Sequence, residues 1–589
     1  MEQAELEQLV RREVRRAVSA AGRRYLPVLA AVLTLITLVV LVPDASTSVQ
    51  GNGAGASLGS NDGTSTGGVT APGSTGTSGP VAGGATGGVP NGSGGATGTT
   101  TGSVPVGGTT GGSSPGTSGS STGATAAASG VAVNGTRCGA GVRQFSFSPY
   151  APMCKARFTG SNGGATAHGV TATTIGLVMR NTADMDATMD AVGASSFAAT
   201  LADTQVLVDY LNKQYELYGR KVVIKTFNGS GSYVSEVGGQ DQAGATSDAQ
   251  QASDIGGFVD PGLPGPTPLT YAHAESGKHV ISIGLPDTLA AARSFYPYEY
   301  QVLAPVLDVE AAGAANLLCQ RMAHLKAVYA GDATYQGKQR TFAAILPSEE
   351  GSSGGTNALF SLVKQKCGVT VEKAAYTVNP STYAQQGAQI AAKLKSEGIT
   401  TVFMFTDVVF APVMTTAAAQ QGYLPEWVDV TAASNESARR MAAQEVAHMM
   451  FVYPWAPQSE ALTDDPCYKI YKLANPKGTP QGNAMNLDQI CASLFEIYGA
   501  LQAAGPRLTP QTFGQGWFSQ PASNGAGNYG VWSFGSNQFA PDSTFTLQWW
   551  RATGTNPYDG GTGSYVACRE KANTPYLASS MGSGQLRCF

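Results

Sequence analysis

Short apolar runs alternate with helical patterns along the stretch from Thr341 to Gly422. Thr341–Leu346 is a short, unbroken apolar run that predicts a buried strand, and two more strands are predicted at Val371–Val378 and Thr400–Thr406. Helical patterns lie between and after these strands, with predicted ends at Cys367, Glu397 and Gln421. Each is followed by the glycine that is common just beyond a helix end: Gly368, Gly398 and Gly422.

Strands that alternate with helices of this length indicate parallel strands joined by right-handed crossovers. Ligands of such sheets bind beyond the carboxyl ends of the strands, because helix N-termini and free loops converge there. Two segments of this stretch therefore become candidates for ligand contact, Glu349–Gly355 and Thr406–Phe410.

A separate series of the same kind begins at Gly169. It contains predicted strands at Thr173–Val178, Lys221–Phe227 and His279–Gly284. The segments between them are a predicted loop at Met179–Gly193, a long helix at Ala194–Tyr218 and a helix around Ala243–Ala252. Two such series in one chain predict two α/β lobes.

The N-terminus carries an uncharged apolar run, Leu26–Val42, behind a basic segment of 24 residues. At 1.5 Å per residue the run reaches about 26 Å, enough for a bilayer core of about 30 Å once flanking residues are included. A cleaved signal peptide is the alternative, but Pro43–Ala45 makes a poor cleavage site. We therefore expect a single-pass cell-membrane anchor at residues 25–43, with residues 1–24 in the cytoplasm and the rest outside.

Residues 44–136 consist almost entirely of small and polar residues, and they hold many of the chain's 75 glycines. Such a segment has too few large apolar side chains to offset the entropy of ordering, which predicts a disordered linker. Its end-to-end distance as a flexible coil is about 50–60 Å, which suits a tether that holds a domain away from a membrane.

All eight cysteines follow the linker, in four pairs of sequence neighbours. An even count restricted to the predicted exterior indicates disulfides rather than free thiols. The clustering favours the pairs Cys138–Cys154, Cys319–Cys367, Cys467–Cys491 and Cys568–Cys588. Zinc is the competing interpretation, and it is disfavoured because the chain has no CxxC motif and its five histidines are scattered.

Several stretches resemble one protein family in collinear order. They include GVTATTIGLVMRN at Gly169, GKHVISIG at Gly277, STYAQQGAQIAAKLKSEGITTVFMF at Ser381 and CASLFEIYGALQAAG at Cys491. Over about Gly169–Trp549 the chain resembles the type I periplasmic binding proteins, the solute receptors of branched-chain amino-acid transporters. The resemblance implies two Rossmann-like lobes with parallel sheets, joined by a three-crossover hinge and closing around a small ligand.

The resemblance also divides the chain, with a solute-binding domain at residues 137–589. Lobe 1 is expected at about 165–304 plus 455–530, and lobe 2 at about 305–454 plus the C-terminal segment. In the family, loops after the strands hold the solute. The positions here that match those loops are Thr182, Pro266, Thr267, Gly284, Asp287, Glu349, Thr406, Asp407, Ser434 and Trp455.

Two patterns suggest other chemistry, and both are incomplete. Gly351–Gly355 matches the G-x-S-x-G elbow of hydrolases, with Ser353, Asp407 and His448 in triad order, but several residues separate the serine from its strand. Three acids, Asp184, Asp186 and Asp190, crowd the first loop. An EF-hand would need Gly at 189 and Glu at 195, where the chain has Met and Ser, so a solvated loop or one facing a cationic ligand is expected.

No P-loop, zinc-protease or kinase signature occurs, so no catalytic residue, metal or cofactor is predicted. The formal net charge of −4 and the lack of a basic stripe argue against nucleic-acid binding. We expect a membrane-tethered extracytoplasmic protein that captures a small polar solute, amino-acid-like or related, for an ABC-type permease. The alternative is a sensor or adhesive ectodomain that kept the fold without transport.

Overall fold

The computed structural model describes residues 130–302, 304–349, 355–430, 434–454, 461–523, 530–568 and 575–588. The expected cytoplasmic segment and membrane anchor, most of the expected linker, Ser353 and Trp455 lie outside these ranges. Within the described ranges, no helix has both the length and the apolar character that crossing a membrane requires.

The end of the expected linker is ordered. A small antiparallel hairpin joins β1 (Gly130–Val131) to β2 (Arg137–Cys138). Its turn is held because the Asn134 amide donates to Gln214 Oε1 at 3.0 Å and because Cys138 is tied to Cys154. The ordered domain therefore starts a few residues earlier than composition alone suggested.

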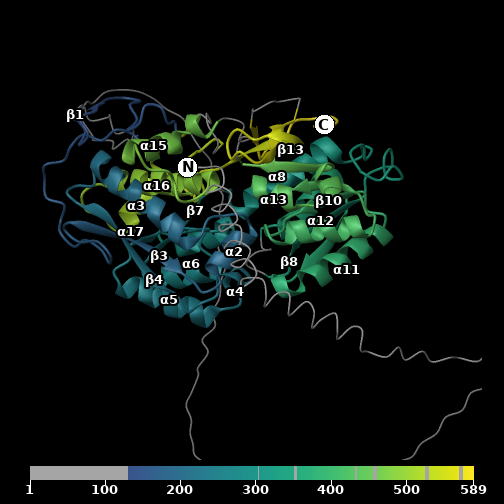
Figure 1. The fold of residues 1–589 in the computed structure, drawn as a ribbon, viewed down its shortest axis with the longest axis horizontal. Coiled ribbons are helices and arrows are strands. Elements are labelled where there is room, and N and C mark those ends of the chain that lie inside the picture. The colour runs from purple at the N-terminus through teal and green to yellow at the C-terminus, as the bar shows by residue number, and fades with distance from the viewer. Residues whose placement is uncertain are drawn as a thin grey trace, which may run out of the picture. The chain divides into compact units, whose positions relative to one another are not determined.

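Lobe 1 is built on a five-stranded parallel sheet (Figure 1). In spatial order its strands are β4 (Lys221–Asn228), β3 (Thr174–Asn181), β5 (Val259–Asp260), β6 (Ile281–Gly284) and β7 (Glu299–Gln301). In chain order this is 2-1-3-4-5, a doubly wound arrangement that places its switch point between β3 and β5.

Helices cover both faces of this sheet. The helices of lobe 1 are α2 (Met185–Ala191), α3 (Phe197–Gln214), α4 (Tyr233–Val237), α5 (Gln242–Asp254), α6 (Leu269–Ser276), α7 (Leu289–Phe295), α15 (Pro466–Ala474), α16 (Ala484–Ala504) and α17 (Pro510–Phe518). The main core lies between the sheet and α3, α16 and α17, and α16 is buried along most of its length. Helices α5 and α6 cover the opposite face, as Figure 1 shows.

Lobe 2 repeats the arrangement and extends it. Its parallel strands, in spatial order, are β9 (Val371–Tyr376), β8 (Phe342–Pro347), β10 (Thr401–Met404), β11 (Glu426–Asp429) and β12 (Met449–Tyr453). The chain order is again 2-1-3-4-5. The C-terminal segment adds three antiparallel strands: β13 (Thr544–Thr555), β14 (Thr562–Ala567) and β15 (Tyr576–Leu577).

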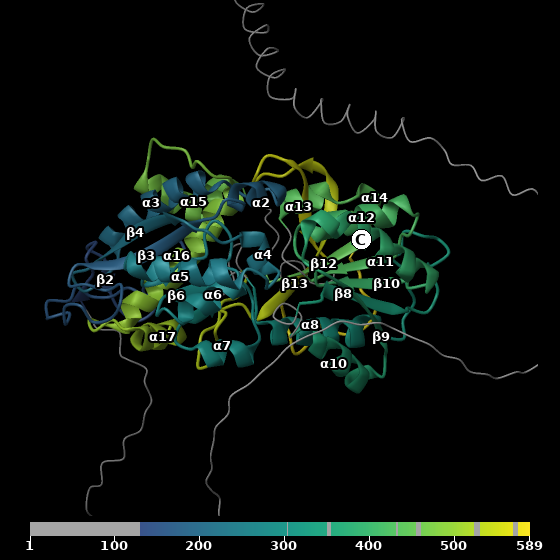
Figure 2. The same cartoon turned by 90° about the horizontal axis from the view of Figure 1, so that it is seen from below.

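Successive residues of β8 point to the two faces of this sheet and enter two separate cores. Figure 2 shows α11 and α12 on one side of β8 and β10, and α8 and α10 on the other. The helices of lobe 2 are α8 (Leu307–Leu317), continued by a π-turn at Leu318–Met322, α10 (Asn357–Cys367), α11 (Tyr383–Ser396), α12 (Phe410–Gln420), α13 (Asn435–Arg440) and α14 (Ala443–Val446). Short 3₁₀ turns occur at Pro380–Thr382 and Leu462–Asp464.

The chain passes between the two sheets three times. In chain order, β7 of lobe 1 is followed by α8 of lobe 2, β12 of lobe 2 by α15 of lobe 1, and α17 of lobe 1 by β13 of lobe 2. Each lobe is thus assembled from segments that are far apart in the sequence.

The predicted α/β alternation agrees with these elements, and the predicted glycines end their helices. Gly368, for example, has a φ of 69° directly after α10. The predicted loop at Met179–Gly193 is wrong, because β3 continues to Asn181 and α2 occupies Met185–Ala191. The long first helix ends at Gln214 rather than Tyr218, since the chain turns through Tyr218 at a positive φ of 58°.

The disulfide pairs are those predicted from neighbouring cysteines. Each lobe contains at least one internal bridge: Cys467–Cys491 joins α15 to α16, and Cys319–Cys367 joins the π-turn to α10. The other pairs are Cys138–Cys154 and Cys568–Cys588, and no cysteine among the described residues is free.

Candidate functional site

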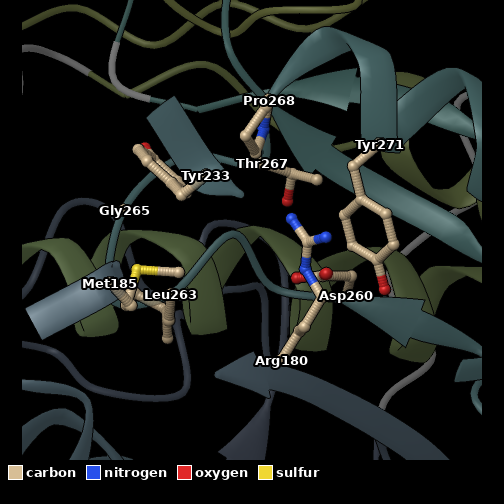
Figure 3. Close-up of a pocket in the computed structure, with 9 residues that line it drawn as sticks. All are labelled: Arg180, Met185, Tyr233, Asp260, Leu263, Gly265, Thr267, Pro268 and Tyr271. Carbon is tan, nitrogen blue, oxygen red and sulfur yellow. The ribbon is translucent and has the colours of Figure 1, made fainter. Parts of the chain in front are cut away.

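A small pocket lies at the carboxyl ends of β3 and β5, the switch point of the lobe 1 sheet, and its volume of about 10 Å³ is close to that of one water molecule. This is where a doubly wound sheet leaves room for a ligand, since the crossovers leave the strands in opposite directions. The residues that line it are Arg180, Met185, Tyr233, Asp260, Leu263, Gly265, Thr267, Pro268 and Tyr271 (Figure 3).

Arg180 is the cation of this pocket, and neighbouring acids hold it in place. Its guanidinium pairs with Glu236 at 2.5 Å and with Asp248 at 3.0 Å, and all three side chains are buried. Figure 3 shows the guanidinium reaching up beside the ring of Tyr271. Burial lowers the pKa of Arg180, but the bonds and charges of Glu236 outweigh it and raise that pKa, so the group is a fixed cation.

Asp260 supplies a carboxylate to the same pocket. Gly262 N donates to its Oδ1 at 2.8 Å. Burial raises the pKa of Asp260 to about 6, although the Gly262 bond and the charge of Arg180 lower it. Glu275 is buried nearby, and burial together with the charge of Asp260 raises its pKa well above the ordinary value. The carboxyl group of Asp260 can therefore accept hydrogen bonds from a ligand or share a proton with it.

The remaining wall is shaped by the loop after β5. Tyr233 Oη donates to the carbonyl of Pro266 at 3.1 Å, and Thr267 Oγ1 donates to the carbonyl of Ile283 at 3.2 Å. A Cβ at Gly265 would lie 2.8 Å from Tyr233 Oη, so the absence of a side chain there keeps this edge open. The proline-rich loop thus places the polar side chain of Thr267 and the aromatic ring of Tyr233 on the wall of the same pocket.

Lobe 2 presents Asp407 at its own switch point, after β10. Tyr376 Oη and Tyr383 Oη each donate to Asp407 Oδ2 at 2.7 Å. The amides of Val409 and Phe410 each donate to Oδ1 at 2.9 Å, so Asp407 caps the start of α12. With both oxygens engaged by the protein, its predicted contact with solute stays a prediction.

Glu349 follows β8, the strand next to β10. Its Oε1 accepts from the amide of Val378 at 2.9 Å, and its buried Oε2 has no hydrogen-bond partner among the described residues. Thr406, the residue before Asp407, is buried at the end of β10. Of the two acids predicted in lobe 2, Glu349 therefore has a carboxylate oxygen without a hydrogen-bond partner among the described residues, whereas both oxygens of Asp407 accept hydrogen bonds.

The other predicted site residues are dispersed. Thr182 donates to Asp184 at 2.6 Å, and Gly284 pairs with the backbone of Thr267 behind the pocket. Ser434 caps α13 by accepting from Ser437 N, and Trp455 lies outside the described residues. The structure brings only Thr267 of the predicted set into the pocket lining, with the Pro266 carbonyl bonded to its wall.

Asp287 belongs to a different cluster. Its Oδ2 lies 3.2 Å from His273 Nε2, and the same nitrogen lies 3.3 Å from Glu299 Oε2. His273 is on α6, Asp287 follows β6, and Glu299 begins β7. Pocket and cluster therefore share the sheet face beneath α6.

Sequence reasoning missed four residues that define the pocket: Arg180, Tyr233, Asp260 and Tyr271. One signal was available, because Arg180 is a charge near the end of an otherwise apolar strand, directly before the expected ligand edge. The two tyrosines carried no such signal, since aromatic residues in helices are usual core residues.

The two lobes contact each other beside α2. Arg440 Nη1 of α13 donates to the carbonyl of Ala191 at 2.5 Å, and Ser434 Oγ donates to the carbonyl of Val192 at 3.4 Å. A Cβ at Gly193 would lie 2.1 Å from the Glu436 side chain. Helix α13 and Ser434 of lobe 2 thus contact the end of α2 and the residues that follow it in lobe 1.

The two incomplete chemical motifs find no support in this geometry. His448 Nδ1 lies 2.9 Å from the Tyr329 carbonyl, while Asp407 is held by two tyrosines, so these members of the suggested triad have other partners. Asp184 accepts from Thr182, Ser232 and two backbone amides, and Asp186 accepts from Phe197 N. Asp184 and Asp186 therefore accept hydrogen bonds from the first residues of α4 and α3.

Among solved structures, similar folds occur in binding proteins. One is a fatty acid ABC transporter substrate-binding protein from Thermomonospora curvata, with 14% identity and a TM-score of 0.50 over 73% of this chain and 100% of that one. The chain has the type I periplasmic binding protein fold. This likeness confirms, at the level of the fold, the family resemblance seen in the sequence.

Two further solved structures show a weaker likeness. A periplasmic binding protein from Burkholderia mallei has 13% identity and a TM-score of 0.47, over 72% of this chain and 99% of that one. A possible leucine/isoleucine/valine-binding protein from Rhodopirellula baltica has 10% identity and a TM-score of 0.44, over 66% and 96%. No protein-family model matches the chain, and no curated protein matches its sequence.

Proposed function

We propose that the protein is a membrane-tethered extracytoplasmic solute-binding protein that passes a small polar solute to an ABC-type permease. The observation that carries the proposal is the pocket at the switch point of a type I binding-protein lobe, lined by Arg180, Asp260 and Thr267. Buried polar groups that converge on a small space are typical of a binding site for a small molecule.

The pocket chemistry favours a solute with hydrogen-bond donors, such as an amino acid or a related amine. Arg180 is already paired with Glu236 and Asp248, whereas Asp260 faces the pocket without a salt bridge to a cation among the described residues. An ammonium or hydroxyl group beside Asp260 would donate a hydrogen bond to its carboxyl group. The ring of Tyr233 offers an apolar surface for the rest of the molecule.

The contacts between the two lobes at α2 support capture of the solute between them. A solute that touches both lobes binds the closed state more tightly than the open state and shifts the equilibrium towards it. In lobe 2 the loops after β8 and β10, which carry Glu349 and Asp407, are the proposed second half of the site. The contact of Arg440 with Ala191 would then be made in the closed state.

The tether and location are proposed from the sequence. The apolar run at residues 26–42 and the arginines before it support a single-pass anchor with the large domain outside the cell membrane. Four disulfides in the described domain are consistent with an oxidising compartment. Alkaline carbonate should leave the full-length protein in the membrane fraction, while a variant lacking residues 1–43 should appear in the soluble fraction.

Solute binding can be tested by thermal unfolding of the full-length protein against amino acids, small amides, carboxylates and sugars. A ligand that binds only the native state adds RT ln(1 + [L]/Kd), which is about 2.7 kcal/mol at a hundredfold excess over Kd. A true ligand should therefore raise the melting temperature by roughly several degrees. Asp260→Asn and Thr267→Ala should each reduce the shift.

The matched control is Thr246→Ala, an exposed threonine on α5 in the same lobe. It should leave the ligand-dependent shift unchanged. If no compound in the panel changes the melting temperature, the proposal of solute capture fails and the interpretation as a sensor or adhesive ectodomain gains weight. If a ligand binds but Asp260→Asn has no effect, the ligand sits outside the described pocket.

A further inference from the structure

His273, Asp287 and Glu299 bring one nitrogen and two carboxylate oxygens to a common point. His273 Nε2, one oxygen of Asp287 and one of Glu299 all lie within 4.8 Å of one another. They come from α6, from the loop after β6 and from the first residue of β7, so the packing of one helix on two strands fixes their positions. The cluster lies outside the solute pocket lining.

The carboxylate of Glu299 lacks hydrogen-bond donors in this cluster. Its side chain is fully buried, yet neither carboxylate oxygen accepts a hydrogen bond from a described residue. The Nε2 of His273 forms a hydrogen bond with Asp287, and its 3.3 Å approach to Glu299 does not have hydrogen-bond geometry. A buried carboxylate without a hydrogen-bond donor is costly, and Glu299 has no positive partner in this cluster when His273 is neutral.

Neighbouring residues fix the orientation of the side chains in this cluster. Thr288 N donates to Asp287 Oδ1 at 2.6 Å, which orients the other oxygen towards His273. The imidazole stacks on Phe295 with centroids 4.1 Å apart, which fixes the plane of the ring. Gln301 lies on the same face of β7 as Glu299, and its buried amide also has no hydrogen-bond partner among the described residues.

Two of the three separations in the cluster suit a tetrahedral metal ion. Ligands at about 2.0–2.1 Å from zinc in a tetrahedron lie about 3.3 Å from each other. The two separations from His273 Nε2, 3.2 Å to Asp287 and 3.3 Å to Glu299, are close to that value. The His273 side chain is 35% exposed, so the cluster lies near the protein surface.

We propose that His273, Asp287 and Glu299 form a binding site for one divalent transition-metal ion of the zinc type. Such a site would supply the positive charge that Glu299 lacks and would tie α6 to β6 and β7. Asp287 also accepts from Leu307 N through its backbone at 3.0 Å, so the ion would brace the point where the chain leaves lobe 1 for α8. The inference is independent of the proposed solute function.

The competing interpretation is an imidazolium held between two carboxylates. Burial lowers the pKa of His273, but its contacts with Asp287 and Glu299 raise it to about 9. A protonated ring would balance the charge without any metal. It would leave one of the two acids without a well-formed hydrogen bond, because Nε2 carries a single proton.

The experiment is a titration of full-length protein, purified without a polyhistidine tag, treated with EDTA and then dialysed. Isothermal titration with ZnCl₂ should show one ion bound per chain. Cobalt(II) should give the intense visible absorption of a tetrahedral complex. Glu299→Gln and His273→Gln should each weaken zinc binding at least about tenfold. The described cysteines are all disulfide-bonded, so thiolate ligands do not compete.

The matched control is His168→Gln, an exposed histidine of the same lobe whose ring contacts only Ser253 among the described residues. It should bind zinc like the wild type, and melting curves verify that every variant is folded. Absence of one-to-one binding in the wild-type protein overturns the proposal in favour of the imidazolium. So does zinc binding by a folded His273→Gln variant with wild-type affinity.

Discussion

The guanidinium carbon of Arg180 lies 3.6 Å from the centroid of the Tyr271 ring, deep in lobe 1. The same group forms buried ion pairs with Glu236 and Asp248, so one side chain ties β3 to α4, α5 and α6. Removing the cation leaves two buried acids without their partner, which is strongly destabilising. Arg180 therefore serves both the wall of the pocket and the stability of the lobe.

Arg180→Met is expected to destabilise lobe 1 by about 3 kcal/mol, since Glu236 can partly relieve the loss by taking up a proton. Calorimetry should show a lower melting temperature for one transition, by roughly 5–10 °C. Lys393→Met, which removes an exposed pair with Glu372, is the control and should cost less than about 1 kcal/mol. Equal effects of the two variants would contradict the buried network.

Arg440→Ala is expected to favour separation of the lobes. It removes the hydrogen bond to the Ala191 carbonyl, a contact worth about 1 kcal/mol at a partly exposed position, or roughly a fivefold change in the equilibrium. Small-angle X-ray scattering should report a larger radius of gyration, and solute should bind more weakly. The neighbouring Arg439→Ala is the control, because Arg439 pairs with Asp559 of its own lobe. An unchanged scattering curve for Arg440→Ala would rule out this contact as a latch.

Replacing both Cys467 and Cys491 by alanine is expected to destabilise lobe 1. The bridge closes a loop with a sequence separation of 24 residues, which corresponds to about 3 kcal/mol in the chain-entropy model. The alanine pair at Cys319 and Cys367, with a separation of 48, should cost lobe 2 about 4 kcal/mol. Urea unfolding followed by tryptophan fluorescence would measure both. A double variant as stable as wild type would show that the bridge contributes nothing.

Much of the fold could be predicted from the sequence because its strands are short apolar runs ended by glycine or a helix signal. Thr341–Leu346 and Lys221–Phe227 correspond to β8 and β4 within a residue or so. The short helix α2 could not be predicted in this way, because it buries only Met185 and Met189 and is otherwise small and polar. Neighbour pairing of cysteines succeeded since each pair closes a local loop.

The pocket was only partly predictable. Of the positions expected to hold the solute, Thr267 lines the pocket, and its contact with a solute stays a prediction. Arg180 and Asp260 are polar residues buried at the ends of two strands. Because buried strands are expected to be apolar, the sequence pattern did not indicate these two residues. The cluster at His273 escaped notice because its members lie on separate elements and share no sequence motif.

Glu445 is expected to make lobe 2 less stable as pH rises from about 4.5 to about 7. Burial raises the pKa of Glu445 from its ordinary value of 4.5 to about 7, although Trp427 Nε1 donates to its Oε2 at 2.7 Å and lowers this pKa. Between those two values the folded state binds more protons than the unfolded state, so stability is highest below the lower one and declines towards the upper one. Urea midpoints measured across this range should show the decline, and Glu445→Gln should flatten it. Trp427→Phe removes the hydrogen bond that favours the charged form, so the decline should then extend above pH 7. Identical pH profiles for the wild type and Glu445→Gln would mean that this carboxyl does not control the stability of the lobe.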